Sequence, residues 1–268
     1  MNNPISRLEL MEALNSIAPV EIAESWDNCG FQVNLLDREF SRILISLDIT
    51  RQVIQEAVDN KCTLIICHHP LYFNGLKSVD NNDIIGEYTV KLVENHISVY
   101  AAHTCFDFAE GGNNDYVAGL LGLTNAKKFP GDVDELLGTY GRLEKSLSLR
   151  ELAEHTCRAL KLDSREIRFV GDGSRKIETV GICTGSGGDM VQAAARLGCD
   201  CFLTGDLKYH DALKFKEMGL AVIDAGHFGT EFNFVENIHQ KLCAKLGLEA
   251  ENSVFIKSRV QENPFDFL

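Results

Sequence analysis

The sequence lacks any apolar run long enough to cross a membrane. Among its 268 residues, no stretch approaches the roughly 18 consecutive apolar residues that a membrane-spanning helix requires. The first ten residues include Arg7 and Glu9 and have no apolar core of the kind found in secretory signal peptides. We therefore expect a cytoplasmic protein with no membrane partner.

Basic residues are few relative to acidic ones. The chain has 26 Lys and Arg against 39 Asp and Glu, which gives a formal net charge of −13. Because nucleic-acid binding depends on clustered Lys and Arg that neutralise phosphates, we expect no general nucleic-acid binding. A small anionic substrate remains compatible with this composition, provided that a local group supplies positive charge. Hydrophobic residues make up 45% and charged residues 24%, values typical of globular proteins, which excludes a disordered chain.

The cysteines do not form a pattern typical of disulfides. There are nine of them, an odd number at irregular spacing, and most lie in apolar stretches. A small secreted disulfide framework usually has an even number of cysteines. We interpret them as reduced thiols, which agrees with a cytoplasmic location.

Segments typical of strands and helices alternate along the chain. Residues 63–67 form an almost continuous apolar run, as in a buried parallel strand, whereas residues 84–95 and 231–246 have the spacing of helices. The polar segment 24–31 predicts a loop. The alternation predicts an α/β fold with parallel or mixed sheets and flanking helices.

The pattern restarts in the middle of the sequence, which predicts two α/β subdomains. We place the first at residues 1–124 and the second at residues 125–231, joined near residues 124–131. Residues 232–268 are expected to return to the first subdomain.

His68 and His69 form the first cluster with chemical potential, directly after the predicted strand 63–67. Loops at the carboxyl ends of parallel strands are the usual ligand-binding edge of an α/β sheet. Pro70 holds His69 in an extended conformation, so the two neighbouring imidazoles can reach two different metal ions. The alternative is a polar loop with two solvent-exposed histidines.

His103 and Asp107 form the second cluster, after the predicted strand 97–101. Imidazole and carboxylate together are ligands for Zn, Fe, Mn or Ni. The alternative is a histidine at a strand end with an aspartate that caps the following turn.

His227 and Glu231 form the third cluster, after the predicted strand 221–224. Their i, i+4 spacing places both on one side of a helix. The alternative is that Thr230 caps this helix and Glu231 interacts with its dipole.

Together the three clusters supply four imidazoles and two carboxylates. This set suits two divalent ions, about 3.5–4 Å apart and bridged by a carboxylate. Since two carboxylates offset only half the charge of two dications, the remaining positive charge suits an anionic or carbonyl substrate and acidifies a bridging water. We therefore favour a single dinuclear site over three unrelated clusters.

Two more loops leave their roles open. Gly185–Gly188 lies between a predicted strand and a predicted helix, and is either an anion cradle or a tight turn. Asp206 and His210 follow the predicted strand 201–204. They either support the ligands and contact the substrate, or belong to a surface loop.

The candidate residues lie within longer motifs that are specific as an ordered set. They are Glu24–Gly30, Ser46–Asp48, His68–Pro70, Tyr100–Asp107, Gly112–Asp115, Gly141–Arg142, Thr184–Gly187, Thr204–His210 and Asp224–Glu231. In these motifs the chain resembles the Nif-three-like family of hexameric proteins with a dinuclear metal centre, known as homologues of GTP cyclohydrolase 1 type 2.

The resemblance implies how the ligands are shared. His68 binds one metal ion together with Asp107, His69 binds the other together with His227, and Glu231 bridges the two. It also implies two divalent ions per chain (Fe, Zn, Mn or Ni), held between the two α/β subdomains. The family's ring-shaped assembly implies a homo-hexamer.

These features support two hypotheses about function. In the first, the protein is a metal-dependent hydrolase: a metal-bridging hydroxide attacks the substrate and His103 moves a proton, unless His103 is itself a further ligand. The resemblance implies a nucleotide-like, cyclic amidine or phosphoester substrate. In the second, the protein is a non-catalytic hexameric scaffold that stores or delivers metal or docks a partner. A saturated coordination shell would favour the second, because a catalytic ion needs an exchangeable position.

Overall fold

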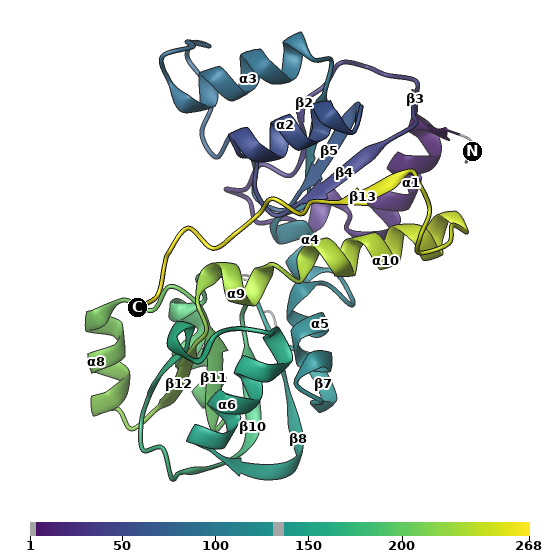
Figure 1. Ribbon diagram of the computed structural model, residues 1–268. Helices are drawn as coiled ribbons and strands as arrows, with labels where there is room; N and C mark the ends of the chain where they lie inside the picture. The colour runs from purple at the N-terminus through teal and green to yellow at the C-terminus, as the bar shows by residue number, and fades with distance from the viewer. Residues whose placement is uncertain (1–3, 131–136) are drawn as a thin grey trace. The chain divides into compact units, whose positions relative to one another are not determined.

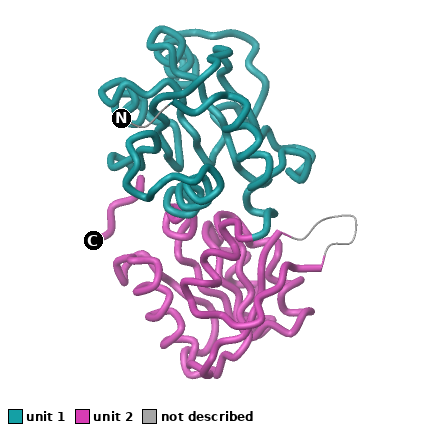
Figure 2. The backbone as a smooth tube through the Cα atoms, turned by 90° about the vertical axis from the view of Figure 1, so that its right-hand side faces the viewer, with its two compact units in different colours: residues 1–110, 234–262 teal, residues 111–233, 263–268 magenta. Residues whose placement is uncertain are grey.

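The chain folds into two compact units in the computed structural model, which describes residues 4–130 and 137–268. Unit 1 comprises Met1–Glu110 and Phe234–Glu262, and unit 2 comprises Gly111–Asn233 and Asn263–Leu268 (Figure 2). The chain thus leaves unit 1 after residue 110 and re-enters it at residue 234. Each unit has its own β-sheet with helices packed beside it (Figure 1).

Unit 1 is built on a five-stranded sheet in the order β13-β4-β5-β6-β2. The strands are β2 (Gly30–Val33), β4 (Ile43–Ser46), β5 (Leu64–Cys67), β6 (Ser98–Ala101) and β13 (Phe255–Lys257). Neighbours from β13 to β6 run parallel, whereas β2 runs antiparallel to β6. Every residue of β4, β5 and β6 is buried, as expected for central strands of a parallel sheet.

The helices of unit 1 hold this sheet in place. They are α1 (Arg7–Ile17), α2 (Arg51–Asp59), α3 (Ile84–Glu94), α4 (Thr104–Phe108) and α10 (Phe234–Leu246), with a short 3-10 turn at Val20–Ile22 and a small β1–β3 ladder (Ile5–Ser6 with Glu39–Phe40). Val53, Ile54 and Leu92 from α2 and α3 pack with Leu44 and Ile65 of the sheet in one buried cluster. The carboxyl ends of the central strands are therefore anchored by a dense core.

Unit 2 is built on a six-stranded sheet in the order β7-β8-β10-β11-β12-β9. The strands are β7 (Thr124–Lys128), β8 (Thr139–Ser148), β9 (Arg168–Val170), β10 (Lys176–Ile182), β11 (Cys201–Thr204) and β12 (Ala221–Asp224). β10, β11 and β12 are parallel, and β8 and β9 pair antiparallel with the two sides of this group. Unit 2 thus has three adjacent parallel strands at the centre of its sheet, where unit 1 has four from β13 to β6.

The helices of unit 2 are α5 (Asn113–Leu120), α6 (Leu149–Leu160), α7 (Val191–Arg196), α8 (Tyr209–Glu217) and α9 (His227–Glu231), with 3-10 turns at Ser164–Glu166 and Gly188–Met190. Val117 of α5 and Leu152 of α6 are buried in one cluster with Val180, Leu203 and Ile223 of the sheet. This cluster fixes the ends of the three parallel strands from which the unit's polar loops begin.

The architecture confirms the predicted α/β class with parallel and mixed sheets, while two local predictions are wrong. The helix predicted over residues 231–246 begins later, as α10 at Phe234. Glu231 instead ends α9, and residues 232–233 separate the two helices where the chain passes from unit 2 to unit 1. β2 begins at Gly30, inside the segment expected to be a loop. It pairs with β6, a partner some 70 residues away in the sequence that a local pattern does not reveal.

The division into units differs from the predicted boundaries at residues 124 and 231. The units separate after residue 110 because α5, which precedes residue 124, packs against β8, β10 and α6 of unit 2. The last residues, Asn263–Leu268, also belong to unit 2, where the Arg165 side chain donates to the carbonyl oxygen of Phe267. Residue 131 of the predicted junction lies outside the described residues.

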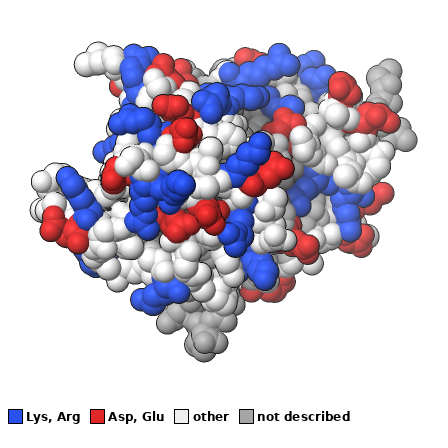
Figure 3. All heavy atoms as spheres, turned by 90° about the horizontal axis from the view of Figure 1, so that it is seen from below, with Lys and Arg blue, Asp and Glu red and all other residues white. Residues whose placement is uncertain are grey.

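Three general properties of the chain concern its cysteines, its helices and its surface charge. All nine cysteines are free. Among the helices formed by the described residues, none combines the length and the apolarity that a membrane span needs. Figure 3 shows one face of the molecule, on which Lys and Arg side chains are interspersed with Asp and Glu side chains. Such a mixed face differs from the clustered basic surface that nucleic-acid binding requires.

Candidate functional site

Three histidines of unit 1 converge at the carboxyl ends of its central strands. His68 and His69 directly follow β5, and His103 follows β6, its parallel neighbour. One ring nitrogen from each of the three lies within 4.8 Å of the others, close enough to hold a metal ion. The turn after β5 is fixed because the backbone N–H groups of His68 and His69 both donate to the carbonyl oxygen of Leu47, at 3.1 and 3.0 Å.

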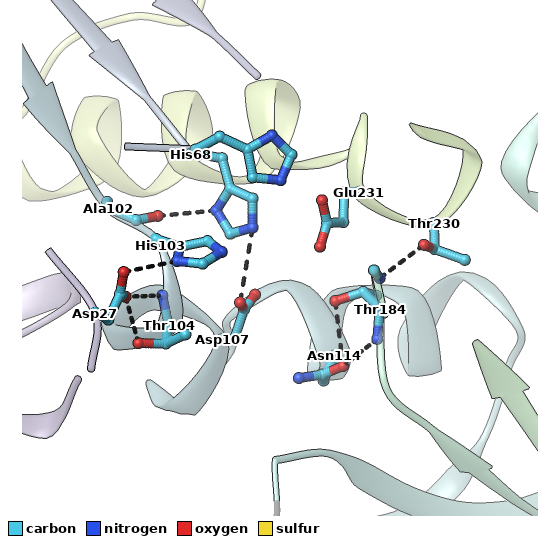
Figure 4. Close-up of polar contacts among 12 residues, drawn as sticks. Asp27, His68, Ala102, His103, Thr104, Asp107, Asn114, Thr184, Thr230 and Glu231 are labelled. Carbon is cyan, nitrogen blue, oxygen red and sulfur yellow. Dashed lines mark hydrogen bonds and ion pairs between the residues drawn. The ribbon is translucent and has the colours of Figure 1, made fainter. Parts of the chain in front are cut away.

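Each of these imidazoles is oriented through its Nδ1 atom. His68 Nδ1 lies 2.9 Å from the carbonyl oxygen of Ala102, and His69 Nδ1 lies 2.7 Å from Asp48 Oδ1. His103 Nδ1 lies 2.9 Å from Asp27 Oδ1 (Figure 4). A carbonyl oxygen or an ionised carboxylate only accepts, so Nδ1 must be the protonated nitrogen. In this tautomer of a neutral imidazole, Nε2 is the nitrogen with the lone pair, which is the atom that binds the cation in metal-binding histidines oriented through Nδ1.

Asp27 is itself held firmly. Its side chain is closed to solvent and accepts from His103 Nδ1, from Thr104 N at 3.1 Å, from Thr104 Oγ1 at 2.5 Å and from Cys29 Sγ at 3.2 Å. Burial by itself would raise the pKa of this carboxyl. The hydrogen bonds from His103 and Thr104, with the charge interaction with the imidazole, outweigh burial and hold its pKa well below the usual range. Asp27 is therefore ionised and able to fix the tautomer of His103.

Asp107 lies in α4 beside His68. Its Oδ2 atom is 3.6 Å from His68 Nε2, and both side chains are almost completely buried (Figure 4). The His68 ring also packs against Phe234, with ring centroids 4.8 Å apart. A buried imidazole nitrogen and a buried carboxylate oxygen at this distance form a donor pair for a divalent cation.

The thiol next to His68 has a different role. Cys67 Sγ donates to the carbonyl oxygen of His69 at 3.2 Å, and complete burial strongly raises the pKa of this thiol. Cys67 is therefore a protonated thiol that positions the backbone of His69 rather than a thiolate ligand.

Unit 2 presents a second imidazole–carboxylate pair at the corresponding edge of its own sheet. His227 and Glu231 are the first and last residues of α9, which follows β12. His227 Nε2 lies 2.9 Å from Glu231 Oε2, and the Glu231 side chain is only 4% exposed. Asp206, in the loop after β11, holds His227 Nδ1 at 2.7 Å. The orientation rule of unit 1 thus recurs in unit 2.

The buried carboxylate of Asp224 ties together the loops that carry Asp206 and His227. Its Oδ1 accepts from Gly226 N at 3.0 Å, and its Oδ2 accepts from Leu207 N at 3.2 Å. The Arg168 guanidinium donates to the same Oδ2 through Nε and Nη2, at 2.9 and 2.7 Å. Asp206 adopts a φ of +53°, a strained value for a non-glycine residue that this network maintains.

The glycine-rich segment after β10 forms a tight turn against Glu231. Gly185 N donates to Thr230 Oγ1 at 2.9 Å (Figure 4), and Gly187 N donates to Thr204 Oγ1 at 2.8 Å. Because these two N–H groups are used inside the unit, the turn is not an anion cradle built on them. Gly185 has a φ of +68°, and a side chain there would overlap Glu231 Oε1. The absence of a side chain at Gly185 therefore leaves the space that the buried carboxylate of Glu231 occupies.

The structure thus brings the predicted residues together within each unit. His68, His69, His103 and Asp107 lie together in unit 1, and His227 and Glu231 lie together in unit 2. His210 is an exposed residue of α8 whose ring contacts Tyr209 edge-on.

Sequence reasoning missed the supporting roles of Asp27 and Asp48. Asp48 ends the segment of residues 43–48, whose apolar pattern is typical of a strand, so its place at a strand end resembles the signal that singled out His68. Asp27 carried no such signal, because it precedes the unpredicted strand β2.

The fold and the site define a class of protein: a two-unit α/β chain in which each unit places oriented imidazoles and carboxylates at the ends of adjacent parallel strands. The chain belongs to the Duf34/NIF3 (NGG1p interacting factor 3) family, whose model matches residues 5–264. This membership confirms the resemblance seen in the sequence motifs.

Relatives match over nearly the whole chain. A Clostridium acetobutylicum protein named GTP cyclohydrolase 1 type 2 homolog is 34% identical over 263 residues, covering 97% of both chains. Saccharomyces cerevisiae NGG1-interacting factor 3 is 33% identical over 280 residues, covering 93% of this chain and 95% of the yeast protein. The crystal structure of Staphylococcus aureus hypothetical protein SA1388 matches with a TM-score of 0.90 and 28% identity, over 99% of this chain and 100% of that one.

Substitution of Gly185 tests how tightly the turn packs on Glu231. We expect Gly185→Ala to destabilise the protein by more than about 1 kcal/mol, because alanine is strained at positive φ and its methyl group would displace the carboxylate. Gly188→Ala is a matched control in the same turn, since a side chain there meets no atom within 4 Å. Urea denaturation followed by circular dichroism measures both. Equal stability of the two variants would contradict this packing.

Proposed function

We propose that the protein binds two divalent metal ions and uses them to hydrolyse a small anionic substrate. The observation that carries the proposal is the clustering of imidazoles and carboxylates within each unit, where a fixed acceptor holds Nδ1 of every imidazole. Relatives named GTP cyclohydrolase 1 type 2 homolog support the hydrolytic class.

The proposed ligands come from both units. His68, His69 and Asp107 of unit 1 and His227 and Glu231 of unit 2 are the residues that would hold the two ions. Mixed nitrogen and oxygen donors suit Fe, Zn, Mn or Ni, so the resident metal depends on what the cell makes available.

Bound ions supply Lewis acidity toward a carbonyl or phosphoryl oxygen and acidify a water molecule. The chain's own contribution is orientation and proton transfer. His103 keeps Nδ1 on ionised Asp27 and therefore has Nε2 available to accept a proton from the reacting group and return it to the leaving group. The substrate we propose is a nucleotide-like, cyclic amidine or phosphoester compound.

Metal content per chain tests the proposed ligands. We expect two ions per wild-type chain after loading with Mn²⁺ or Zn²⁺, and the loss of at least one in His68→Ala and in Glu231→Gln, because each change removes a donor. Asp206→Asn keeps every ligand and tolerates the positive φ, but removes the negative charge that holds His227. Its metal affinity should fall about 10- to 100-fold. Elemental analysis of the washed proteins and competition with a chelator provide the two readouts.

The control for these variants is Asp266→Asn, which removes an exposed carboxylate near the end of the chain. It should keep both ions and the wild-type affinity. Unchanged metal content in His68→Ala and Glu231→Gln would rule out the proposed centre.

Hydrolysis is tested separately, with metal-loaded protein and a panel that includes GTP, cyclic nucleotides and phosphomonoesters. We expect turnover by the wild type and a rate lower by about 10²- to 10⁴-fold in His103→Gln, which lacks the proton carrier and whose metal content is measured in parallel. Equal rates in the two proteins would remove His103 from the mechanism. Fully loaded wild-type protein without turnover on any member of the panel would overturn the hydrolase in favour of the metal-binding scaffold.

We also propose a homo-hexamer, as family membership supports. The expected result is a species of six times the 29.8 kDa chain mass in sedimentation velocity measurements. A monomer or dimer at micromolar concentration would contradict it.

A further inference from the structure

Two large aromatic side chains beside the histidine cluster of unit 1 are unusually exposed. Trp26 is 62% exposed and Phe73 is 54% exposed. Single exposed apolar residues are common and need no explanation, but two aromatic rings next to a candidate reaction site do.

Both rings contact the same imidazole. The Trp26 and Phe73 ring centroids lie 6.0 and 5.7 Å from that of His103, and both rings stand nearly perpendicular to it, at 74° and 88°. The two aromatic residues come from different loops, one before β2 and one after β5. Segments about 45 residues apart in the chain therefore place aromatic surface around one proposed proton carrier.

An amide network joins the two loops directly. Asn28 Nδ2 donates to the carbonyl oxygen of Tyr72 at 2.7 Å, two residues from Trp26 and one from Phe73. Gln32 Oε1 accepts from Tyr72 N at 3.2 Å and from Asn28 Nδ2 at 3.1 Å, while Gln32 Nε2 donates to the carbonyl oxygen of Asn28 at 2.7 Å. The spacing of the two aromatic residues is therefore set by hydrogen bonds before any ligand arrives.

The Trp26 loop is also fixed at its other end. Glu24 N donates to Thr104 Oγ1 at 3.0 Å, and Asp27 accepts from Thr104 and His103. The indole thus projects from a loop anchored on both sides of it. A preorganised aromatic surface loses little conformational entropy when a ligand stacks on it.

From this arrangement we propose that Trp26 and Phe73 form a stacking subsite for a planar nitrogen heteroaromatic ring of the substrate, next to His103. Aromatic faces stack on planar rings whatever their substituents, and ring nitrogens tolerate the polar environment of the imidazoles. The inference rests on the proposed function in one respect, that the stacked compound is the substrate to be hydrolysed. Stacking itself does not depend on bound metal, because neither Trp26 nor Phe73 is a proposed metal ligand.

The sole tryptophan makes the test direct, because all indole fluorescence of the chain comes from Trp26. The full-length protein is titrated with guanosine 5′-monophosphate and, in parallel, with ribose 5-phosphate. Free N-acetyltryptophanamide corrects for absorption and collisional quenching. We expect saturable quenching by the nucleotide and none by the sugar phosphate. Quenching by both to the same extent, or by neither, would overturn the subsite.

Two variants separate stacking from general effects. Phe73→Leu keeps the reporter and an apolar side chain but removes one aromatic face, so nucleotide binding should weaken about tenfold, the equivalent of one stacked base. Phe265→Leu, a change at an exposed phenylalanine of unit 2, is the matched control and should bind like the wild type. Wild-type affinity in Phe73→Leu would contradict the proposal.

The same titration distinguishes failure of the subsite from failure of the metal proposal. In His68→Ala, saturable quenching by the nucleotide should persist, because the stacking residues are intact even if metal is lost. Loss of quenching in this variant would show that the nucleotide binds through the metal rather than by stacking on Trp26 and Phe73, and would overturn the stacking role. A Trp26 emission that changes with protein concentration but not with nucleotide would assign the two rings to a contact with a second copy of the chain, which would also overturn it.

Discussion

The structure of the candidate site depends on one interaction, the hydrogen bond from the Nδ1–H group of each imidazole to a fixed acceptor. Without it, a histidine side chain would sample both tautomers and several ring orientations, and its lone pair would have no defined direction. With it, the protein fixes the tautomer, the ring plane and the position of Nε2 together. The four pairs are His68 with Ala102, His69 with Asp48, His103 with Asp27, and His227 with Asp206.

Sheet order explains why these pairs exist. In every pair the histidine and its acceptor come from segments that border adjacent strands: β5 with β6, β5 with β4, β6 with β2, and β12 with β11. Adjacent parallel strands end side by side, so a residue just past one strand meets a residue just past the next. β2 fits the same rule because it runs antiparallel to β6, which brings its start, with Asp27, to the same edge. The register of the sheet therefore orients the site.

This dependence also explains what the sequence could and could not predict. A histidine after an apolar run is a local signal, so the sequence alone singles out His68, His69, His103 and His227 as candidates, and the alternation of elements predicts the α/β class. Their acceptors depend on which strands are neighbours, and these acceptors lie 21 to 76 residues away from the histidines in the chain. The sequence did not predict the break between α9 and α10, because the apolar periodicity continues across it while the chain passes from unit 2 to unit 1.

The choice of acceptor follows burial and charge. His68, which is completely buried, uses the neutral carbonyl of Ala102, whereas the three partly exposed imidazoles use carboxylates. Placing another carboxylate beside His68 and Asp107 would bury a second negative charge at a large desolvation cost. Asp27 is buried too, but four hydrogen bonds to its carboxylate offset that cost. The buried imidazole of His68 instead has the carboxylate of Asp107 beside its Nε2 atom, at 3.6 Å.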